Sequence, residues 1–129
     1  MVFFALENAL GGEIFVPKIP SYRITEVAKA IGPDCDHPIV GIRPGEKVHE
    51  EMITSSDSLN TIETNKYYVI TPNSQEKSKG KVGKYLKHYS AKSVDSGFRY
   101  SSGANTVWLS IDEIRALIQR HVDPDFCVK

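Results

Sequence analysis

The chain has 129 residues, 40% of them hydrophobic, which is enough for one folded domain with a real core and excludes a disordered segment. Sixteen Lys and Arg residues balance sixteen Asp and Glu residues, so the net charge is zero and a global basic field for nucleic acid or anionic membrane is absent. Two cysteines are too few for a disulfide framework or a four-thiolate zinc site, and they fit a reducing cytoplasm.

The first third of the chain predicts short helices and strands in alternation. Apolar residues at helical spacing lead to Gly11-Gly12, which ends the first helix, and residues 13–18 follow as a short buried strand. Thr25 is the expected N-cap of a helix over residues 26–31. Residues 37–42 form a second β-branched run. The order strand, helix, strand predicts a parallel βαβ unit with a right-handed crossover.

The segment from Arg43 to Lys47 is the best functional candidate. It directly follows the second predicted strand, and α/β folds place ligands at the C-terminal ends of their strands. The Arg43 guanidinium is a planar fork that can hold two phosphate oxygens, and Glu46 can accept hydrogen bonds from a sugar hydroxyl pair. An Arg–Glu pair that only stabilises a turn is an equally good explanation at this point. A short helix is expected over residues 46–52, with His49 on its face.

The middle of the chain predicts a polar surface loop over residues 54–64, in which Leu59 and Ile62 are possible anchors. Residues 67–70 form a third expected strand, rich in aromatic and β-branched side chains. Residues 72–97 are expected to form a mobile, lysine-rich loop, with Tyr85-Leu86 touching the body of the domain.

The C-terminal third predicts one short strand and one helix. Residues 98–100 could add the strand, and Ser110 with Glu113 forms a capping box for the helix. Asp123-Pro124 ends it. The expected buried stripe of this helix consists of Ile111, Ile114, Leu117 and Ile118.

The loop over residues 100–106 is a second functional candidate. Ser101, Ser102 and Asn105 offer hydroxyls and a carboxamide that suit the hydroxyls and phosphates of a nucleotide-sugar. The simpler explanation is a polar turn that leads into the last helix.

Three other patterns have simpler explanations. Residues 34–37 carry two Asp, a Cys and a His, but adjacent side chains rarely reach one ion together, so a turn is preferred and no metal is expected. His49 lacks the second histidine, four residues on, of a zinc-protease helix. The lysines of residues 77–87 are read as solvated, and no nucleic-acid partner is expected.

Three blocks together resemble one known family: residues 12–21, residues 42–50, and Tyr100-Ser101-Ser102 with Trp108-Leu109. They are similar to the C-terminal part of the inverting UDP-N-acetylglucosamine 4,6-dehydratases, which are extended short-chain dehydrogenase/reductases of the pseudaminic acid pathway. The resemblance implies an α/β fold with a small mixed sheet and flanking helices. It also implies that residues 1–129 are the substrate-binding C-terminal segment, without the N-terminal Rossmann domain that holds NADP in the family.

The resemblance also implies roles for individual residues. Arg43 would clamp the diphosphate, Glu46 would bond the uridine ribose, and the loop with Ser101, Ser102 and Asn105 would close on the nucleotide-sugar. No tyrosine here has a lysine four residues later, and no Gly-rich dinucleotide fingerprint is present. We therefore expect no catalytic residue and no cofactor bound by this segment.

The expected function follows from that resemblance. The chain would supply UDP-sugar contacts to a nucleotide-sugar dehydratase in the cytoplasm and would not turn over substrate alone. Its expected partners are the UDP-sugar and either the missing Rossmann domain or a second copy of the chain, with no membrane involved. The alternative is a stand-alone module that binds UDP-sugars or another protein.

Overall fold

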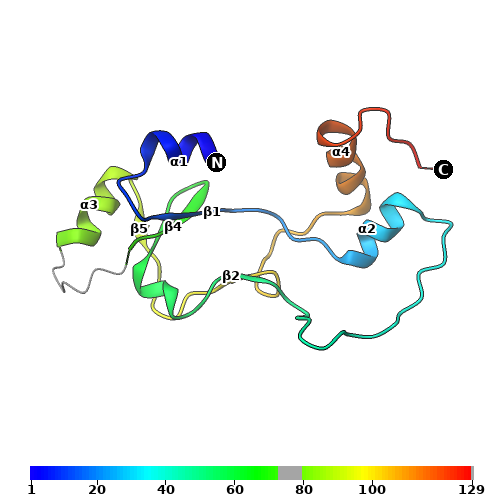
Figure 1. Cartoon of the computed structure of the whole chain (residues 1–129), viewed down its shortest axis with the longest axis horizontal. Coiled ribbons are helices and arrows are strands. Elements are labelled where there is room, and N and C mark those ends of the chain that lie inside the picture. The colour runs from blue at the N-terminus through cyan, green and yellow to red at the C-terminus, as the bar shows by residue number, and fades with distance from the viewer. Residues whose placement is uncertain (73–79, 129) are drawn as a thin grey trace. The chain divides into compact units, whose positions relative to one another are not determined.

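The computed structural model describes residues 1–72 and 80–128, and these residues divide into two compact units. Figure 1 gives the course of the chain through both. The first unit comprises Met1–Lys18 and His49–Ala104, and the second comprises Ile19–Val48 and Asn105–Lys129.

The first unit contains two antiparallel sheets with short helices. Its elements are α1 (Val2–Asn8), β1 (Ile14–Pro17), β2 (Glu51–Ile53), the 3-10 helix η1 (Asp57–Asn60), β3 (Thr61–Glu63), β4 (Tyr67–Ile70), α3 (Gly80–His88), β5 (Lys92–Ser93) and β6 (Tyr100–Ser101). The larger sheet has the strand order β1-β4-β3-β5, and β2 pairs with β6 in the smaller one. The strands predicted over 13–18 and 67–70 are confirmed as β1 and β4.

Strand β4 connects the two parts of the core. Successive side chains of a strand point to opposite faces of its sheet. Tyr68 accordingly packs with Val16 and Ile53 in one buried cluster, while Val69 packs with Ile62 and Tyr89 in the other. The central position of β4 between β1 and β3 therefore lets one short strand supply both hydrophobic clusters.

Helix α3 lies in a segment that was expected to be irregular. Val82, Tyr85 and Leu86 pack against the cluster of Ile62, Val69 and Tyr89, so the predicted contact of Tyr85-Leu86 with the body is confirmed. The expectation of a loop throughout 72–97 is wrong over Gly80–His88. These residues form a helix because the apolar side chains on one of its faces pack against the hydrophobic core. Residues 73–79 of that prediction lie outside the described part of the chain.

The N-terminal helix packs through one aromatic side chain. The Phe4 ring centroid lies 5.7 Å from that of Phe15 and 5.0 Å from that of Tyr67. Phe3 and Leu6 remain 81% and 78% exposed, so the helix presents a second, uncovered apolar side. The helix ends before Gly11-Gly12, as predicted.

The carboxylate of Glu13 stabilises the turn that follows α1. Glu13 accepts hydrogen bonds from the backbone N–H groups of Leu10 and Gly11, at 2.7 and 2.6 Å, and from the hydroxyl of the buried Tyr89, at 2.8 Å. Burial alone would raise the pKa of Glu13, but these hydrogen bonds to its charged form outweigh burial and lower the pKa.

The second unit is built on α2 (Ile24–Ile31) and α4 (Ile111–His121), which pack together. The predicted capping box of α4 is confirmed, since Glu113 N donates to Ser110 Oγ at 3.3 Å and Ser110 N donates to the Glu113 carboxylate at 2.8 Å. Arg115 of α4 donates to the carbonyl of Ala30 at 3.1 Å, which satisfies a carbonyl in the last turn of α2.

Two details of these helices differ from the prediction. Helix α2 begins at Ile24 with Arg23 as its N-cap, because the Glu26 carboxylate pairs with the Arg23 guanidinium at 3.2 Å and accepts from its backbone N–H at 3.4 Å. Thr25 is therefore inside the helix. In the predicted stripe of α4, Ile114 is buried whereas Leu117 is 38% exposed.

The predicted parallel βαβ unit is wrong. Residues 37–42 form no strand, and Ile39 and Val40 are 94% and 88% exposed. Figure 1 shows the chain between α2 and β2 as one long connection without helix or strand. The named strands pair antiparallel, and the parallel pairing among the described residues is an isolated bridge between Ser21 and Trp108.

Three smaller expectations are corrected in the first unit. Residues 46–52 do not form a helix, because Glu51–Ile53 pairs as β2 with β6. The loop over 54–64 contains η1 and β3, with Ile62 buried as expected and Leu59 75% exposed. The possible strand at 98–100 overlaps the observed β6 (Tyr100–Ser101) at Tyr100 alone.

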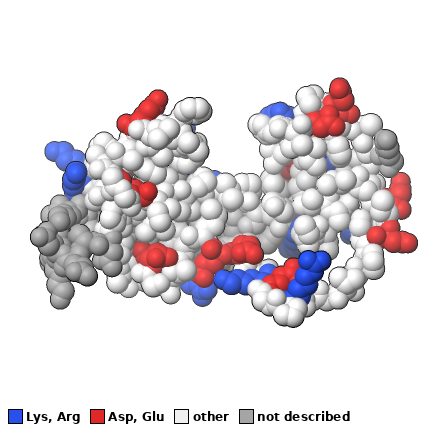
Figure 2. Space-filling view, viewed as in Figure 1, with Lys and Arg blue, Asp and Glu red and all other residues white. Residues whose placement is uncertain are grey.

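The expected fold class is confirmed, because the chain is a small α/β structure whose sheet is flanked by helices. Within the described residues, no helix is both long and apolar enough to cross a membrane. Figure 2 shows acidic and basic side chains interspersed over the visible described surface, without a broad area of one sign.

Candidate functional site

Arg43 opens a tight turn in the second unit. The backbone N–H of Glu46 donates to the Arg43 carbonyl at 3.0 Å, which closes a four-residue turn. Pro44 occupies its second position, and Gly45 has φ = +83° at the third, the pattern of a type II turn. The turn does not stand at the exit of a strand, since residues 37–42 are not one. Its shape comes from its own sequence.

The carboxylate of Glu46 holds this turn from the other side. Its Oε2 atom accepts a hydrogen bond from the backbone N–H of Arg43 at 2.9 Å. The Arg43 side chain is exposed, and within the described residues its guanidinium has no hydrogen bond or ion pair. Glu46 thus stabilises the turn through the Arg43 backbone, which leaves the guanidinium available to an anion.

Ser101 and Ser102 lie in the first unit, where the chain leaves β6. Ser101 is paired with Glu51 across the two-stranded sheet. Ser102 forms two hydrogen bonds with Glu50, since its backbone N–H donates to the Glu50 carbonyl at 2.8 Å and its Oγ accepts from the Glu50 N–H at 3.1 Å. The Ser102 hydroxyl therefore fixes the loop and keeps its own proton for another acceptor.

Asn105 connects three parts of the second unit. Its Nδ2 donates to the carbonyl of Ile19 at 2.9 Å and to Ser21 Oγ at 3.0 Å, and its Oδ1 accepts from Val107 N at 3.1 Å. The indole of Trp108 donates to the Asn105 carbonyl at 2.8 Å. The contacts give Asn105 a positioning role, and its contact with a nucleotide-sugar stays a prediction.

The structure groups the five predicted site residues into three places. Arg43 and Glu46 share one turn, Ser101 and Ser102 are neighbours on one loop of the first unit, and Asn105 sits beside Ile19 and Ser21 in the second unit. Of these three places, the Arg43–Glu46 turn is the one that presents a charged side chain without a partner among the described residues.

His49 is a neighbour of the serine loop that was not expected from the sequence. Its imidazole Nδ1 lies 3.5 Å from Ser102 Oγ. A signal was available, because residues 42–50 and Tyr100-Ser101-Ser102 are two of the blocks that share one family pattern. The mispredicted helix over residues 46–52 concealed the pairing of β2 with β6 that brings His49 and Ser102 together.

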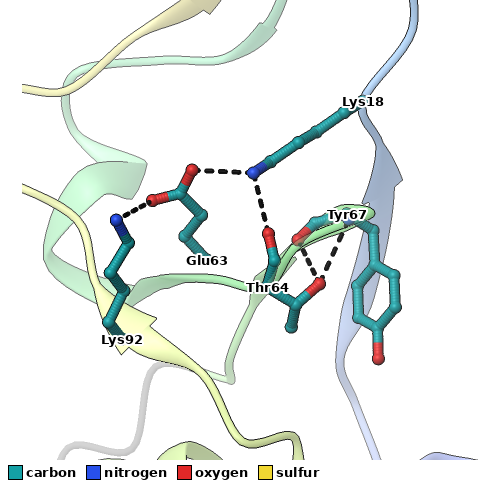
Figure 3. A network of polar contacts seen from close by, with 5 residues as sticks. All are labelled: Lys18, Glu63, Thr64, Tyr67 and Lys92. Atoms are coloured by element: carbon teal, nitrogen blue, oxygen red, sulfur yellow. Dashed lines mark hydrogen bonds and ion pairs between the residues drawn. The ribbon is translucent and has the colours of Figure 1, made fainter.

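A charge network elsewhere in the first unit is structural. Figure 3 shows Glu63 between two lysines: Lys18 Nζ lies 2.7 Å from its Oε1 and Lys92 Nζ lies 3.1 Å from its Oε2. Lys18 also donates to the Thr64 carbonyl at 2.7 Å and stands over the Tyr68 ring. The hydrogen bond from Lys18 holds the pKa of Glu63 below its usual value, with Lys92 adding to the effect.

Within the described residues there is neither a cluster of metal ligands nor a glycine turn of the dinucleotide-binding kind at Gly11-Gly12 or Gly83. Across residues 1–72 and 80–128, no group of three or more His, Cys, Asp or Glu side chains is placed to hold a metal ion. Gly11-Gly12 precedes β1 and Gly83 lies inside α3, so neither makes the glycine turn between a strand and a helix that a dinucleotide phosphate needs. These three glycines therefore do not form the phosphate-binding turn of an NADP site.

Comparison with known proteins places the chain in a family. The family model described as "Polysaccharide biosynthesis protein" matches residues 1–72. The chain is 42% identical to the UDP-N-acetylglucosamine 4,6-dehydratase (inverting) of Campylobacter jejuni, over 87% of this chain and 34% of that protein, in its C-terminal part. It is 29% identical to the UDP-glucose 4-epimerase of Rickettsia canadensis, over 92% of this chain and 34% of that one.

A solved structure has a similar fold. Pen from Bacillus thuringiensis superposes with a TM-score of 0.68 at 24% identity, covering 93% of this chain and 33% of that one. The chain thus spans about a third of the length of the curated relatives it matches. Since the family model covers more than half of its residues, the chain belongs to the polysaccharide biosynthesis protein family.

Proposed function

We propose that this chain is the substrate-side part of a nucleotide-sugar dehydratase and that it binds a UDP-sugar through the Arg43–Glu46 turn. One observation carries the proposal: the Arg43 guanidinium is exposed and unpaired among the described residues, on a turn that Glu46 and Gly45 hold in shape. Both similar enzymes, a dehydratase and an epimerase, are named after a UDP-sugar, which favours a UDP-sugar as the ligand of this chain.

The chemistry of the turn suits a diphosphate on a ribose. A guanidinium can donate two parallel hydrogen bonds to phosphate oxygens, and such charge-assisted pairs are the strongest hydrogen bonds that side chains form. Glu46 uses Oε2 on the Arg43 backbone, so its other oxygen is left to accept from ribose hydroxyls. In this proposal Arg43 holds the diphosphate and Glu46 the ribose.

Under this proposal the chain does not carry out the reaction alone. It has no tyrosine followed four residues later by lysine, and its sequence has no Gly-rich dinucleotide fingerprint. Hydride transfer, which NADP supplies in the family that this sequence resembles, is assigned to a separate Rossmann-type domain. The two free, exposed cysteines, Cys35 and Cys127, fit the expected cytoplasmic location.

A partner for the chain is part of the proposal. Phe3 and Leu6 on α1, and Ile39 and Val40 between α2 and β2, are large apolar side chains left mostly uncovered. Exposed apolar groups of this size favour an interface with another protein surface. We propose that the partner is the Rossmann-type domain or a second copy, and these exposed residues also keep the alternative of an interaction module open.

The test is a titration with UDP by isothermal calorimetry. Replacing Arg43 with Ala should weaken binding by about 2 kcal/mol, roughly thirtyfold, because a charge-assisted pair is lost. Arg43→Lys should recover only part of the affinity, since an ammonium lacks the planar fork. Arg120→Ala, an exposed arginine on α4, is the matched control and should leave the affinity unchanged.

Two outcomes would contradict the proposal. UDP affinity that does not depend on Arg43, or no UDP binding at millimolar concentration, would leave the interaction module as the remaining explanation. Formation of a 4-keto sugar from UDP-N-acetylglucosamine and NADP by this chain alone would show that it is catalytically complete.

A further inference from the structure

Helices α1 and α3 cover the same face of the larger sheet in the first unit. The Phe4 ring of α1 lies against the rings of Phe15 and Tyr67. Both of these rings pack on the buried cluster that Val82 and Leu86 of α3 also contact. The sides of α1 and α3 that are turned away from this cluster therefore both point away from the same face of the sheet.

The two helices also meet at their C-terminal ends. Asn8 is the last residue of α1, and His88 is the last residue of α3. The His88 Nε2 atom lies 2.9 Å from the carbonyl oxygen of Asn8, and the Tyr89 hydroxyl lies 3.0 Å from the same oxygen. Figure 1 shows α1 and α3 as neighbours in the first unit. Their outer sides thus form one continuous surface.

The outer side of α1 is apolar. At 3.6 residues per turn, Val2 and Leu6 each lie about 160° around the helix from Phe4, so they point away from the sheet. Val2, Phe3 and Leu6 are 72%, 81% and 78% exposed. Neighbouring apolar side chains that remain this exposed favour a contact with another protein surface.

Charged side chains of both signs stand beside this apolar patch. Lys87 is two residues from Tyr85, which packs on the buried cluster, so Lys87 points outward from α3. Lys84 and Glu7 are exposed as well. Among the described residues, none of these three charged groups has an ion-pair partner. A surface that carries an apolar patch and unpaired charges of both signs can be complementary to a second copy of itself.

We propose that the outer surface of α1 and α3 is a contact between two copies of this chain, related by a two-fold axis. In such a contact the same patch is used by both copies, so the apolar side of α1 is covered by its counterpart and Glu7 of one copy faces the α3 lysines of the other. The inference rests on the proposed function only for the existence of a partner, and it commits to a second copy.

The size of the surface predicts a weak dimer. Helices of seven and nine residues are about 10 and 14 Å long and about 10 Å wide. A contact between two such surfaces buries no more than roughly 1,000 Å² in total, which is the lower end for specific interfaces. The dissociation constant should therefore be micromolar or weaker.

The test is sedimentation equilibrium of the full chain over about 5 to 500 µM, a range that brackets such a dimer. Leu6→Glu should raise the dissociation constant at least about tenfold, because it places an unpaired charge in the apolar centre of the contact. Leu59→Glu is the matched control, since Leu59 on η1 is 75% exposed in the same unit, and it should leave the dissociation constant unchanged. Circular dichroism of each variant establishes that it is folded.

A charge exchange tests the pairing across the two-fold axis. Glu7→Lys should weaken the dimer about threefold to tenfold, because it then faces the lysines of α3 with the same sign. Lys84→Glu combined with Lys87→Glu should weaken it similarly, because these groups then face Glu7. All three substitutions together reverse both signs and should restore the affinity. Weakening without restoration would reject the two-fold arrangement.

The outcomes separate this inference from the proposed function. A chain that stays monomeric up to about 500 µM rejects the second copy and leaves the Rossmann-type domain as the proposed partner. Equal weakening by Leu6→Glu and Leu59→Glu rejects α1 as the contact. UDP affinity should be the same in Leu6→Glu as in the unaltered chain. A dimer that forms without any UDP binding supports this inference while it rejects the nucleotide site at Arg43.

Discussion

The two units use similar apolar sequence in opposite ways. In the first, Ile62 and Val69 come from short antiparallel strands and are almost completely buried. In the second, Ile39 and Val40 belong to an equally β-branched run and are almost completely exposed. A strand needs a neighbour for its backbone hydrogen bonds as well as apolar side chains. The second unit offers residues 37–42 no such neighbour within the described chain.

The largest expected effect comes from the core of the first unit. Ile62→Ala should lower the free energy of unfolding by about 3 kcal/mol, because a buried side chain is replaced by a cavity. Ile39→Ala makes the same chemical change on a side chain that is 94% exposed and should change it by less than about 0.5 kcal/mol. Urea unfolding followed by circular dichroism measures both. Equal losses would mean that residues 37–42 are covered in solution, for example by a second copy.

A smaller effect is expected at the start of α4 in the second unit. Ser110→Ala removes the side-chain acceptor of the capping box and should cost about 1 kcal/mol in the same unfolding experiment. Thr106→Ala, an exposed hydroxyl of the same unit, is the control and should cost little. If Ser110→Ala costs nothing, α4 depends on its packing against α2 and not on its cap.

A pH-dependent effect of up to about 1 kcal/mol is expected at Glu63, since pairs of this exposure contribute no more. Lys18 and Lys92 lower the pKa of Glu63 in the folded protein, so between that pKa and the higher unfolded one the unfolded state binds more protons. The stabilisation is therefore present above the unfolded pKa and is lost as pH falls through the folded pKa.

The comparison of the protein with Glu63→Gln isolates this contribution. The difference in unfolding free energy should be largest above the unfolded pKa of Glu63 and should shrink as pH falls through the lowered folded pKa and Glu63 becomes protonated. Lys18→Met should have a larger effect than Lys92→Met, because the Lys18 side chain is 29% exposed and that of Lys92 is 78% exposed. A difference that does not vary with pH would indicate that packing, not charge, accounts for the effect.

Sequence reasoning succeeded where the determining interactions are local. The capping box of Ser110 and Glu113 spans three residues, and the aromatic, β-branched run of Tyr67–Ile70 lies between turn residues. The capping box contains its own stabilising hydrogen bonds. The run Tyr67–Ile70 is recognisable from its composition, although the strand itself is stabilised by pairing with β1 and β3. The structure of two other segments depends on residues that are far away in the sequence. No strand lies beside residues 37–42 within the described chain, and Gly80–His88 covers a cluster formed by β3 and β4.

The candidate site likewise has one part that local sequence specifies and one part that depends on residues far away in the sequence. The turn at Arg43 was predictable because Pro44 and Gly45 specify it locally. The approach of His49 to Ser102 was not, because it depends on the pairing of two strands almost fifty residues apart in sequence. Asn105 was selected for its polar side chain, but a sequence cannot reveal that this amide is already engaged by Ile19 and Ser21.

The smallest effect on stability is expected at Gly45. Its φ of +83° is strained for a side chain, so Gly45→Ala disfavours the present turn. Because the segment around it is exposed and poorly packed, the turn can open at a cost of less than about 0.5 kcal/mol to the free energy of unfolding. UDP affinity should nevertheless fall severalfold, since the Arg43 guanidinium is no longer presented by a fixed backbone. Gly41→Ala, at φ = +87° just before the turn, is the control: equal loss of affinity there would mean that the whole segment, and not the turn, positions Arg43.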